Sequence, residues 1–336
     1  MAEKRTVRVA LVGAGGMASR YHHPSLASFP DVEIAAICDL VEPKARQNAE
    51  RFGIPRVYTD YKRMLEEVDP EAVWVLMPPQ HLYEPAATVL HQGRHLFVEK
   101  PLALTTVQAR MLAYFAERRH CLTSVGFQRR HVPAITDLRR RVEERGPIHH
   151  ASVKFVKSTR NLETHAGFYD GAIDPLTSDG IHAVDLLRWL CGGEVAEVHA
   201  SVRTRYIVGP IANEYIALVT FSSGAVGLLQ SSYVTGRRIF CSEFHAKNVT
   251  AYVDAEGESS IVFDDGATES RSSTEWGTAG GAKGDSPEHW LGFWHENRHF
   301  VDCVQSGALP STHFGDAVKS MELVDRIVHG GAVTSQ

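Results

Sequence analysis

The residues of this chain that could do chemistry lie in three stretches that are far apart in the sequence. Glycines mark a short turn from Gly13 to Ala18, a lysine ends an apolar run in Glu99-Lys100-Pro101, and His182 stands three residues before Asp185. Glycine-rich turns bind phosphates, an ammonium can hold a hydroxyl, and a histidine beside a carboxylate can move a proton. We therefore expect the fold to gather these stretches in one cleft, with Lys100 at its centre.

The glycine turn has the form G-x-G-x-x-A and follows a β-branched run. Gly13 would allow the tight turn, Gly15 would let the backbone approach a pyrophosphate, and Ala18 would let the next helix pack on the strand. Asp39 ends the following apolar run, where a ribose 2′-hydroxyl is usually bound, and Leu40 stands where NADP would favour an arginine. The pattern therefore predicts NAD rather than NADP. The residues of the turn expected to contact the cofactor are Gly13, Gly15, Gly16, Met17 and Ala18.

Lys100 stands at the end of a predicted buried strand, after Leu96-Phe97-Val98. A lysine at such a position most often forms a structural salt bridge. In a dinucleotide-binding fold, however, the C-terminal ends of the parallel strands form the ligand crevice. An ammonium there can hold a substrate hydroxyl beside the nicotinamide and favour its alkoxide character. We therefore interpret Lys100 as a residue that binds the substrate and takes part in catalysis.

His182 lies at the start of a predicted helix that Asp179-Gly180 opens. A lone histidine is more often structural than catalytic. His182 is nevertheless expected to face the cleft, and Asp185 follows at a spacing that lets it orient the imidazole ring. We therefore expect His182 to act as the general base.

The segment His295-Glu296-Asn297-Arg298-His299 matches H-E-x-x-H, the signature of zinc proteases. We interpret the match as coincidental, because its helix continues into apolar residues such as Phe300 and because a protease would leave Lys100 unexplained. The pairs His22-His23 and His149-His150 lack metal-ligand spacing. They are predicted to lie on the surface or in loops, where His22-His23 could touch the cofactor. No metal site is expected.

The pattern of apolar residues predicts two domains. Apolar runs alternate with predicted helices over residues 1–127, which indicates βαβ units and an α/β Rossmann domain with a parallel sheet. Residues 128–336 show period-two alternation and turn signals, which predict an α+β domain with a large, mostly antiparallel sheet. Helices at Leu186 to Leu190 and Trp290 to Val304 would cover one face of it. The other face would be open and pair subunits in a homodimer or homotetramer.

The composition excludes several classes of function. The chain has 35 basic and 40 acidic residues, a formal charge of −5, which disfavours a nucleic-acid partner. Its five cysteines are widely spaced without a C-x-x-C, which argues against a disulfide framework and fits a reducing compartment. No apolar stretch is long enough to span a membrane. We therefore expect a cytoplasmic protein with a small-molecule substrate.

Together these residues resemble the glucose–fructose oxidoreductase/inositol dehydrogenase (Gfo/Idh/MocA) family, nearly from end to end. The resemblance rests on the glycine turn, on Asp39 and on the stretch that leads from Pro78 into Glu99-Lys100-Pro101. Three further segments carry it: Gly126-Phe127-Gln128-Arg129-Arg130, Gly180-Ile181-His182-Ala183-Val184-Asp185, and a tail with Glu296, Phe300, Gly307 and Pro310. The resemblance implies an NAD(P)-dependent dehydrogenase that acts on secondary alcohols or ketones of sugars, cyclitols or their derivatives.

The family resemblance also implies roles for single residues. It implies that Lys100 holds the reacting hydroxyl or carbonyl and that His182 moves the proton. By the same resemblance, the expected cofactor contacts outside the glycine turn and Asp39 are Pro78, His81, Glu99, Lys100 and Gln128.

The chain departs from the family at the catalytic acid. An aspartate usually lies four residues before the histidine, and this chain has Ser178 there. Either Asp179 takes that role, or Asp174 substitutes for it, or Lys100 and His182 suffice.

The substrate pocket is expected to draw on the loop between residues 157 and 179. Its candidate residues, besides Lys100 and His182, are Arg160, His165, Tyr169 and Asp174. Two other functions stay open. A tightly held NAD could be recycled in a net epimerisation, hydrolysis or substrate exchange, or the chain could be an inactive regulator that binds NAD or a sugar.

Overall fold

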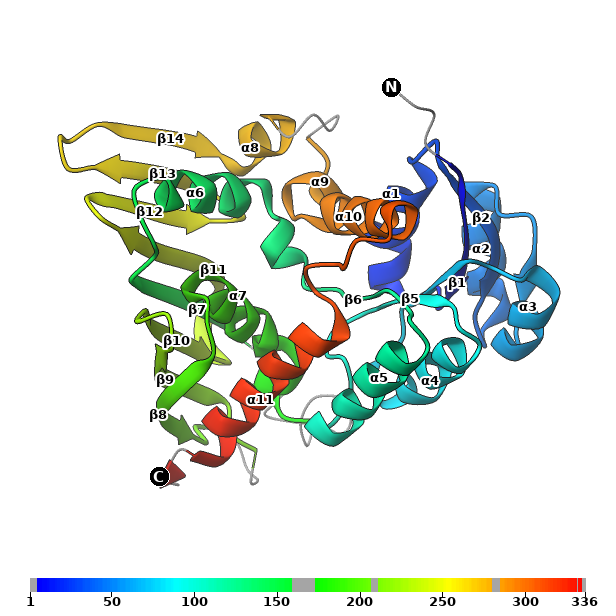
Figure 1. Cartoon of the computed structure of the whole chain (residues 1–336), viewed down its shortest axis with the longest axis horizontal. Helices are drawn as coiled ribbons and strands as arrows, with labels where there is room; N and C mark the ends of the chain where they lie inside the picture. Colours follow the sequence, from blue (N-terminus) through cyan, green and yellow to red (C-terminus); the bar gives the residue numbers. More distant parts are fainter. Residues whose placement is uncertain (1–4, 159–172, 207–210, 280–284, 331, 334–336) are drawn as a thin grey trace. The chain divides into compact units, whose positions relative to one another are not determined.

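The computed structural model describes residues 5–158, 173–206, 211–279, 285–330 and 332–333. The chain divides into two compact units (Figure 1). Met1–Gln128 and Phe293–Val318 make up the first unit, and Arg129–Gly292 and Lys319–Gln336 make up the second. Each unit is built on a sheet of its own.

A six-stranded parallel sheet with the order β3-β2-β1-β4-β5-β6 forms the first unit. The order reverses at β1, which has β2 on one side and β4 on the other, so a ligand crevice is expected at the C-terminal ends of β1 and β4. This arrangement confirms the Rossmann fold predicted from the sequence. The strands are β1 (Val7–Val12), β2 (Val32–Cys38), β3 (Val57–Tyr58), β4 (Ala72–Val75), β5 (His95–Val98) and β6 (Thr123–Val125).

Helices connect these strands, and caps mark the ends of two of them. The helix predicted after the glycine turn consists of two short pieces, a π-helical turn and α1. Asp60 caps α3 through its carboxylate, and Gly53 ends α2 with a φ of 66°. The pieces are η1 (Ala18–His22), α1 (His23–Ala27), α2 (Glu42–Phe52), α3 (Tyr61–Val68), η2 (Pro79–His81), α4 (Tyr83–His91) and α5 (Thr106–Arg118).

The chain returns to the first unit at α10 (Phe293–Ser306), long after the Rossmann strands end. Phe300, Val301 and Val304 of α10 belong to the same buried core cluster as residues of β1 and β4. The sequence pattern predicted instead that a helix from Trp290 to Val304 covers the antiparallel sheet, and that prediction is wrong. An apolar helix face shows that the helix is packed, but it does not show on which sheet.

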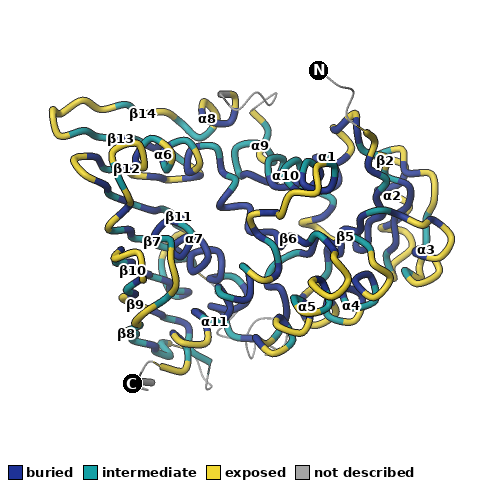
Figure 2. The backbone as a smooth tube through the Cα atoms, viewed as in Figure 1, coloured by how far each residue is buried: buried dark blue, intermediate teal, exposed yellow. Residues whose placement is uncertain are grey.

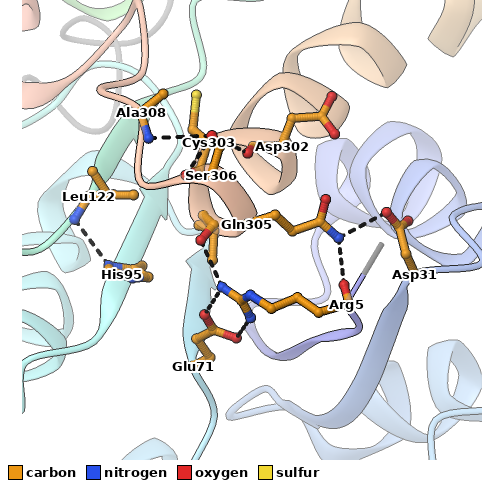
Figure 3. A network of polar contacts seen from close by, with 11 residues as sticks. Arg5, Asp31, Glu71, His95, Leu122, Asp302, Cys303, Gln305, Ser306 and Ala308 are labelled. Atoms are coloured by element: carbon orange, nitrogen blue, oxygen red, sulfur yellow. Dashed lines mark hydrogen bonds and ion pairs between the residues drawn. The ribbon is translucent and has the colours of Figure 1, made fainter. Parts of the chain in front are cut away.

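Polar contacts hold the end of α10 on the first unit (Figure 3). The guanidinium of Arg5 donates to the Glu71 carboxylate at 2.7 and 2.6 Å and to the carbonyl oxygen of Val304 at 2.8 Å. Gln305 Nε2 donates to the carbonyl oxygen of Arg5 at 2.6 Å and to Asp31 Oδ2 at 3.0 Å. These contacts fix the position of α10 along the N-terminal segment.

A nine-stranded sheet with the order β14-β13-β12-β11-β7-β10-β9-β8-β15 forms the second unit. Its pairs are antiparallel except for β7 with β10 and β8 with β15, which confirms the predicted mostly antiparallel sheet. The strands are β7 (His150–Ser158), β8 (Val195–Arg203), β9 (Glu214–Phe221), β10 (Val226–Ser232), β11 (Val234–Ala246), β12 (Val249–Asp254), β13 (Glu258–Phe263), β14 (Thr268–Ser272) and β15 (Ala332–Val333).

Helices α6 (Pro133–Glu143) and α7 (Ile181–Cys191) lie on one face of this sheet (Figure 1). Buried and more exposed residues alternate along β9, β10 and β12, which gives one covered and one more exposed face (Figure 2). Three apolar side chains on the exposed positions, Ile216, Leu218 and Tyr252, are each nearly half exposed.

The remaining elements are short or near the C-terminus. The turns η3 (Gln128–His131) and η6 (Leu176–Gly180) precede α6 and α7, α8 (Ser273–Ala279) and α9 (Pro287–Trp290) precede α10, and α11 (Phe314–Gly330) follows it. Within the described part of the chain, none of the helices is long and apolar enough to cross a membrane.

Candidate active site

The glycine turn follows β1 and lies against Leu76, the residue after β4. Gly13 has a φ of 106°, and a Cβ atom at this position would lie 2.3 Å from the carbonyl oxygen of Leu76. The Gly13 N–H donates to the carbonyl oxygen of Cys38 at 2.8 Å. Both the backbone angle and the close approach exclude a side chain, so this position requires glycine.

The next two glycines leave the backbone of the turn uncovered. A Cβ atom added at Gly15 or Gly16 would have no heavy atom outside the neighbouring residues within 4 Å. Met17 is 47% exposed, whereas Ala18 is buried at the start of η1. An uncovered turn at the start of a helix offers its N–H groups to an anion such as a pyrophosphate.

The carboxylate of Asp39 is joined to the glycine turn. Its Oδ2 accepts a hydrogen bond from the Ala14 N–H at 2.7 Å, and its Oδ1 accepts one from the Val41 N–H at 2.8 Å. Each carboxylate oxygen can accept a further hydrogen bond. The side chain is therefore held beside the turn with acceptor capacity left for a ribose hydroxyl.

Lys100 follows β5 and is half-buried, and its peptide bond to Pro101 is cis. The carboxylate of the preceding Glu99 accepts from His22 Nε2 at 2.9 Å and from the Lys100 N–H at 3.0 Å. Burial by itself would raise the pKa of Glu99, but the hydrogen bond from His22, the charge that a protonated His22 would carry and the nearby Lys100 ammonium together lower that pKa. A negative charge thus lies next to Lys100.

The histidine pair beside the glycine turn is buried. His22 and His23 are both 0% exposed, so the prediction that they lie on the surface or in a loop is wrong. His22 binds Glu99, and His23 Nδ1 lies 3.0 Å from Asn48 Oδ1. A pair of histidines has no apolar periodicity, and no sequence signal shows that partners far along the chain bury them.

The H-E-x-x-H segment lies in α10 and packs in the first unit. His299 Nε2 accepts a hydrogen bond from the Ser311 N–H at 3.0 Å. Glu296 is 2% exposed, and burial together with the neighbouring Glu99 raises its pKa well above the usual value. Among the described residues, no group of three histidine, cysteine or acidic side chains could hold a metal ion. The arrangement fits a packing helix.

Three predicted cofactor contacts lie at the ends of β4 and β6. Pro78 and His81 are exposed in the segment that contains η2. Gln128 is buried at the start of η3, and its side-chain oxygen has no hydrogen-bond partner among the described residues. These three positions stay predictions as cofactor contacts.

His182 lies in the first turn of α7 and is 8% exposed. Asp179, in η6, forms an ion pair with Lys157 of β7. Gly180 between them is tightly packed, because a Cβ atom there would lie 2.8 Å from Leu176 Cδ1 and 3.0 Å from the Tyr233 hydroxyl. The turn that carries Asp179 and His182 is therefore fixed on the sheet, and sequence reasoning did not single out Lys157.

Asp185 does not have the role expected for it. Its carboxylate accepts from Arg130 Nε at 2.7 Å, from Arg130 Nη2 at 2.5 Å and from the Ser320 hydroxyl at 2.7 Å. Asp185 is 0% exposed and holds α7 to η3 and α11. The prediction that it orients His182 is therefore wrong. The sequence feature that could have indicated its partner is the arginine pair after Gln128.

The remaining predicted substrate residues divide into two groups. Asp174 accepts hydrogen bonds from the Thr177 N–H at 3.0 Å and from the Thr177 hydroxyl, and so stabilises the start of η6. Arg160, His165 and Tyr169 lie outside the described residues.

The structure groups the candidate residues within each unit. The first unit joins Asp39 to the glycine turn and Glu99 to His22 and the Lys100 backbone. The second unit joins Asp179 to Lys157 on the turn that precedes His182. That Lys100 and His182 act on one substrate stays a prediction.

Known proteins and family models resemble both parts of this chain. Residues 7–127 match the model described as "Oxidoreductase family, NAD-binding Rossmann fold", and residues 143–251 match the model of the GFO/IDH/MocA C-terminal domain. The chain is 25% identical to scyllo-inositol 2-dehydrogenase (NAD(+)) of Bacillus subtilis, over 94% of this chain and 92% of that protein. It is 30% identical to D-glucoside 3-dehydrogenase of Escherichia coli, over 55% of this chain and 54% of that protein.

A solved structure shows the same fold. The chain superposes on GenD2 from gentamicin A biosynthesis, in complex with NAD, with a TM-score of 0.79 and 26% identity. The match covers 97% of this chain and 94% of GenD2.

Proposed function

Because the chain belongs to the Gfo/Idh/MocA family of NAD-binding oxidoreductases, we propose that it transfers a hydride between NAD and a secondary alcohol or ketone of a sugar, a cyclitol or a related compound. The observation that carries this proposal is the hydrogen bond from Ala14 to Asp39, because it holds a carboxylate suited to ribose beside the glycine turn. The names of the inositol and glucoside dehydrogenases similar to this chain support the class of substrate.

The residues of the turn fit NAD. Gly13 lets the backbone pass β4, the uncovered N–H groups near Gly15 suit a pyrophosphate, and Asp39 can accept hydrogen bonds from ribose hydroxyls. Bound NAD supplies the hydride acceptor. Leu40, 82% exposed, stands where recognition of a 2′-phosphate would favour an arginine, which supports NAD over NADP.

Lys100 and His182 have complementary roles in the proposed reaction. Lys100 holds the oxygen of the reacting carbon, and its positive charge favours the alkoxide as the hydride leaves. His182 takes the hydroxyl proton in oxidation and returns it in reduction. Asp179 is already paired with Lys157, so we assign the proton transfer to His182 and a positioning role to Asp179.

A panel of inositols, glucosides and sugar acids with NAD+ and NADP+ tests the proposal, followed at the absorbance of reduced nicotinamide. We expect NADH with at least one member. Lys100→Met should lose this activity and bind NAD+ as before by calorimetry, and Lys62→Met, a change of an exposed lysine in the same unit, should change neither. Full activity of Lys100→Met would refute the assignment.

Two other results of the panel would favour the alternative functions. Binding of NAD+ without turnover of any substrate would indicate a regulator. Turnover by protein that carries its own cofactor, with none added, would indicate a net non-redox reaction.

We also propose that copies of the chain pair through the exposed face of the second sheet, as a homodimer or homotetramer. Leu218 and Leu228 are cross-strand neighbours on that face, and Ile216 lies beside them along β9. Leu218→Lys should lower the mass measured by light scattering to that of a smaller assembly. The cytoplasmic location expected from the cysteines stays a prediction.

A further inference from the structure

A continuous chain of polar contacts runs through the core of the first unit from Trp74 to Lys100. Trp74 Nε1 donates to Asn297 Oδ1 at 2.8 Å. Asn297 Nδ2 lies 3.1 Å from His22 Nδ1, and His22 Nε2 lies 2.9 Å from Glu99 Oε1. Glu99 Oε2 accepts from the Lys100 N–H at 3.0 Å. Trp74, Asn297 and His22 are each 0% exposed, so water does not compete for these groups.

The contacts of Asn297 fix which way its amide points. The indole nitrogen of Trp74 is only a donor, so the amide atom that faces it must be the oxygen. The amide nitrogen then donates to the carbonyl oxygen of Phe293 at 2.7 Å and faces His22 Nδ1. His22 Nδ1 also lies 3.4 Å from Asn297 Oδ1, but that oxygen already accepts from Trp74 at 2.8 Å, and the amide nitrogen is nearer to the ring. An amide NH2 cannot accept a hydrogen bond, so the nearer contact assigns His22 Nδ1 as the acceptor, without a proton.

The position of the histidine proton follows from that of the amide. A neutral imidazole whose Nδ1 accepts carries its proton on Nε2, and His22 Nε2 faces Glu99. The ring is held in this orientation by edge-on contacts with Phe97 and Phe293, each at a centroid distance of 5.4 Å. Glu99 therefore receives one N–H donor on each oxygen, an arrangement that stabilises its ionised form.

The other titratable groups near His22 and Glu99 are His23, Glu296 and Lys100. Burial lowers the pKa of His23 to about 4, so His23 is neutral. Glu296 lies on α10 near Glu99, and neither of its oxygens has a hydrogen-bond partner among the described residues. Burial and the charge of Glu99 raise its pKa and so favour its neutral acid form. Lys100 is the nearby cation whose charge acts on Glu99.

We propose that Asn297 is a positioning residue for Lys100: it holds His22 as the neutral Nε2–H tautomer, and His22 in turn holds Glu99 as the carboxylate that fixes the Lys100 peptide and whose charge acts on the Lys100 ammonium. The functional importance of these contacts rests on the proposed role of Lys100 in hydride transfer. The hydrogen-bond chain itself does not. The H-E-x-x-H segment thus contributes Asn297 to this chain of contacts.

Asn297→Asp is the informative variant. An aspartate keeps an acceptor for Trp74 but presents a carboxylate to His22 Nδ1, which makes that nitrogen a donor and favours the imidazolium. Protein labelled with ¹⁵N-histidine, observed by long-range ¹H–¹⁵N NMR, reports the tautomer. His22→Gln identifies the signals of His22. We expect wild-type His22 as the neutral Nε2–H form, and both nitrogens protonated in Asn297→Asp under the same conditions.

Chemical reactivity of Lys100 tests the link to the ammonium without any substrate. A positive His22 compensates the charge of Glu99, so Glu99 should attract the Lys100 ammonium less strongly. Reductive methylation of Lys100 by formaldehyde and cyanoborohydride at pH 8, followed by peptide mass spectrometry, should be several-fold faster in Asn297→Asp. Lys62 in the same digest is the internal reference. Gln305→Glu, another amide-to-acid change on α10 that contacts Arg5 and Asp31 instead, should leave the rate unchanged.

The same measurements distinguish the proposal from a purely structural role of Asn297. If Asn297→Asp does not fold, Trp74→Phe removes the donor that orients Asn297, and a mixture of His22 tautomers is then expected. The proposal is overturned if wild-type His22 is charged or carries its proton on Nδ1, or if the methylation rate of Lys100 is the same in both proteins. If both measurements agree with the proposal and no substrate of the panel is oxidised, the proposed hydride transfer is refuted, but the positioning role of Asn297 is supported.

Discussion

The backbone N–H of Ala14 donates to the carboxylate of Asp39 at 2.7 Å, although 25 residues separate them. The contact joins the turn after β1 to the end of β2, the two places where a dinucleotide fold binds the pyrophosphate and the ribose. Asp39 thus has two tasks, because it supports the turn and offers its remaining lone pairs to a ligand.

Asp39→Ala should weaken NAD+ binding about 10- to 100-fold, the effect of losing a charged hydrogen-bond partner. Asp39→Asn keeps an acceptor for Ala14 and should lose less. Calorimetric titration with NAD+ and NADP+ checks both variants. NADP+ binding should change little, because its 2′-phosphate does not benefit from the carboxylate. An unchanged preference between the two cofactors would contradict the ribose assignment.

Gly13→Ala should destabilise the protein by more than 3 kcal/mol, on the order of the cost of combined backbone strain and overpacking. The new Cβ atom would lie 2.3 Å from the carbonyl oxygen of Leu76, at a φ of 106°. Gly53→Ala is the matched control, because Gly53 also has a positive φ but nothing within 4 Å of the added atom. It should cost about 1 kcal/mol. Urea denaturation of both variants measures the difference, and equal losses would argue against the close approach.

The sequence allowed the parallel sheet, the glycine turn and Asp39 to be predicted because their signals are local. Each is an apolar run followed within a few residues by glycine or an acid, and parallel strands bring their C-terminal ends to the same edge. The mostly antiparallel second sheet was predictable for a similar reason, from period-two alternation.

The errors concern partners that are distant in the sequence. Asp185 lies three residues after His182, but its carboxylate binds Arg130, 55 residues away, because a buried carboxylate requires a charged partner. His22 is buried by Asn297, 275 residues away. Neither pairing produces a periodic signal in the sequence. The sequence of a helix such as α10 also does not indicate on which unit the helix packs.

Asp185→Asn should destabilise the protein by about 3–5 kcal/mol, since it leaves the buried Arg130 guanidinium without its counter-charge. Glu194→Gln breaks the exposed pair with Lys319 and should cost less than about 1 kcal/mol. Chemical denaturation of the two variants gives the comparison. If Asp185 instead oriented a catalytic His182, Asp185→Asn would lose activity while remaining as stable as the wild type, the opposite of the expected result.

Replacement of His23 should change how stability depends on pH. Burial lowers the pKa of His23 from 6.5 in the unfolded chain to about 4 in the folded protein. As the pH falls, His23 therefore takes up a proton in the unfolded chain before it does so in the folded protein. The contribution of His23 to the free energy of unfolding is present above pH 6.5 and is lost as the pH falls towards 4. The loss is about 3 kcal/mol by linkage. His23→Gln should flatten the decrease in melting temperature between pH 6.5 and 4, and a curve parallel to the wild type would contradict a buried neutral histidine.

Glu296→Gln should stabilise the folded protein at neutral pH. Burial and the nearby Glu99 raise the pKa of Glu296 above its value in the unfolded chain. Above that value the unfolded chain has released the Glu296 proton, and the protein must bind a proton again when it folds. The wild type is therefore penalised as the pH rises above 4.5, whereas glutamine has no proton to lose. The melting temperature of Glu296→Gln should exceed that of the wild type at pH 8, and the gain should disappear near pH 4. Glu66→Gln, on an exposed side chain of α3, controls for the loss of a charge and should show no such pH dependence. A variant less stable than the wild type at pH 8 would mean that Glu296 is ionised and has a partner in solution.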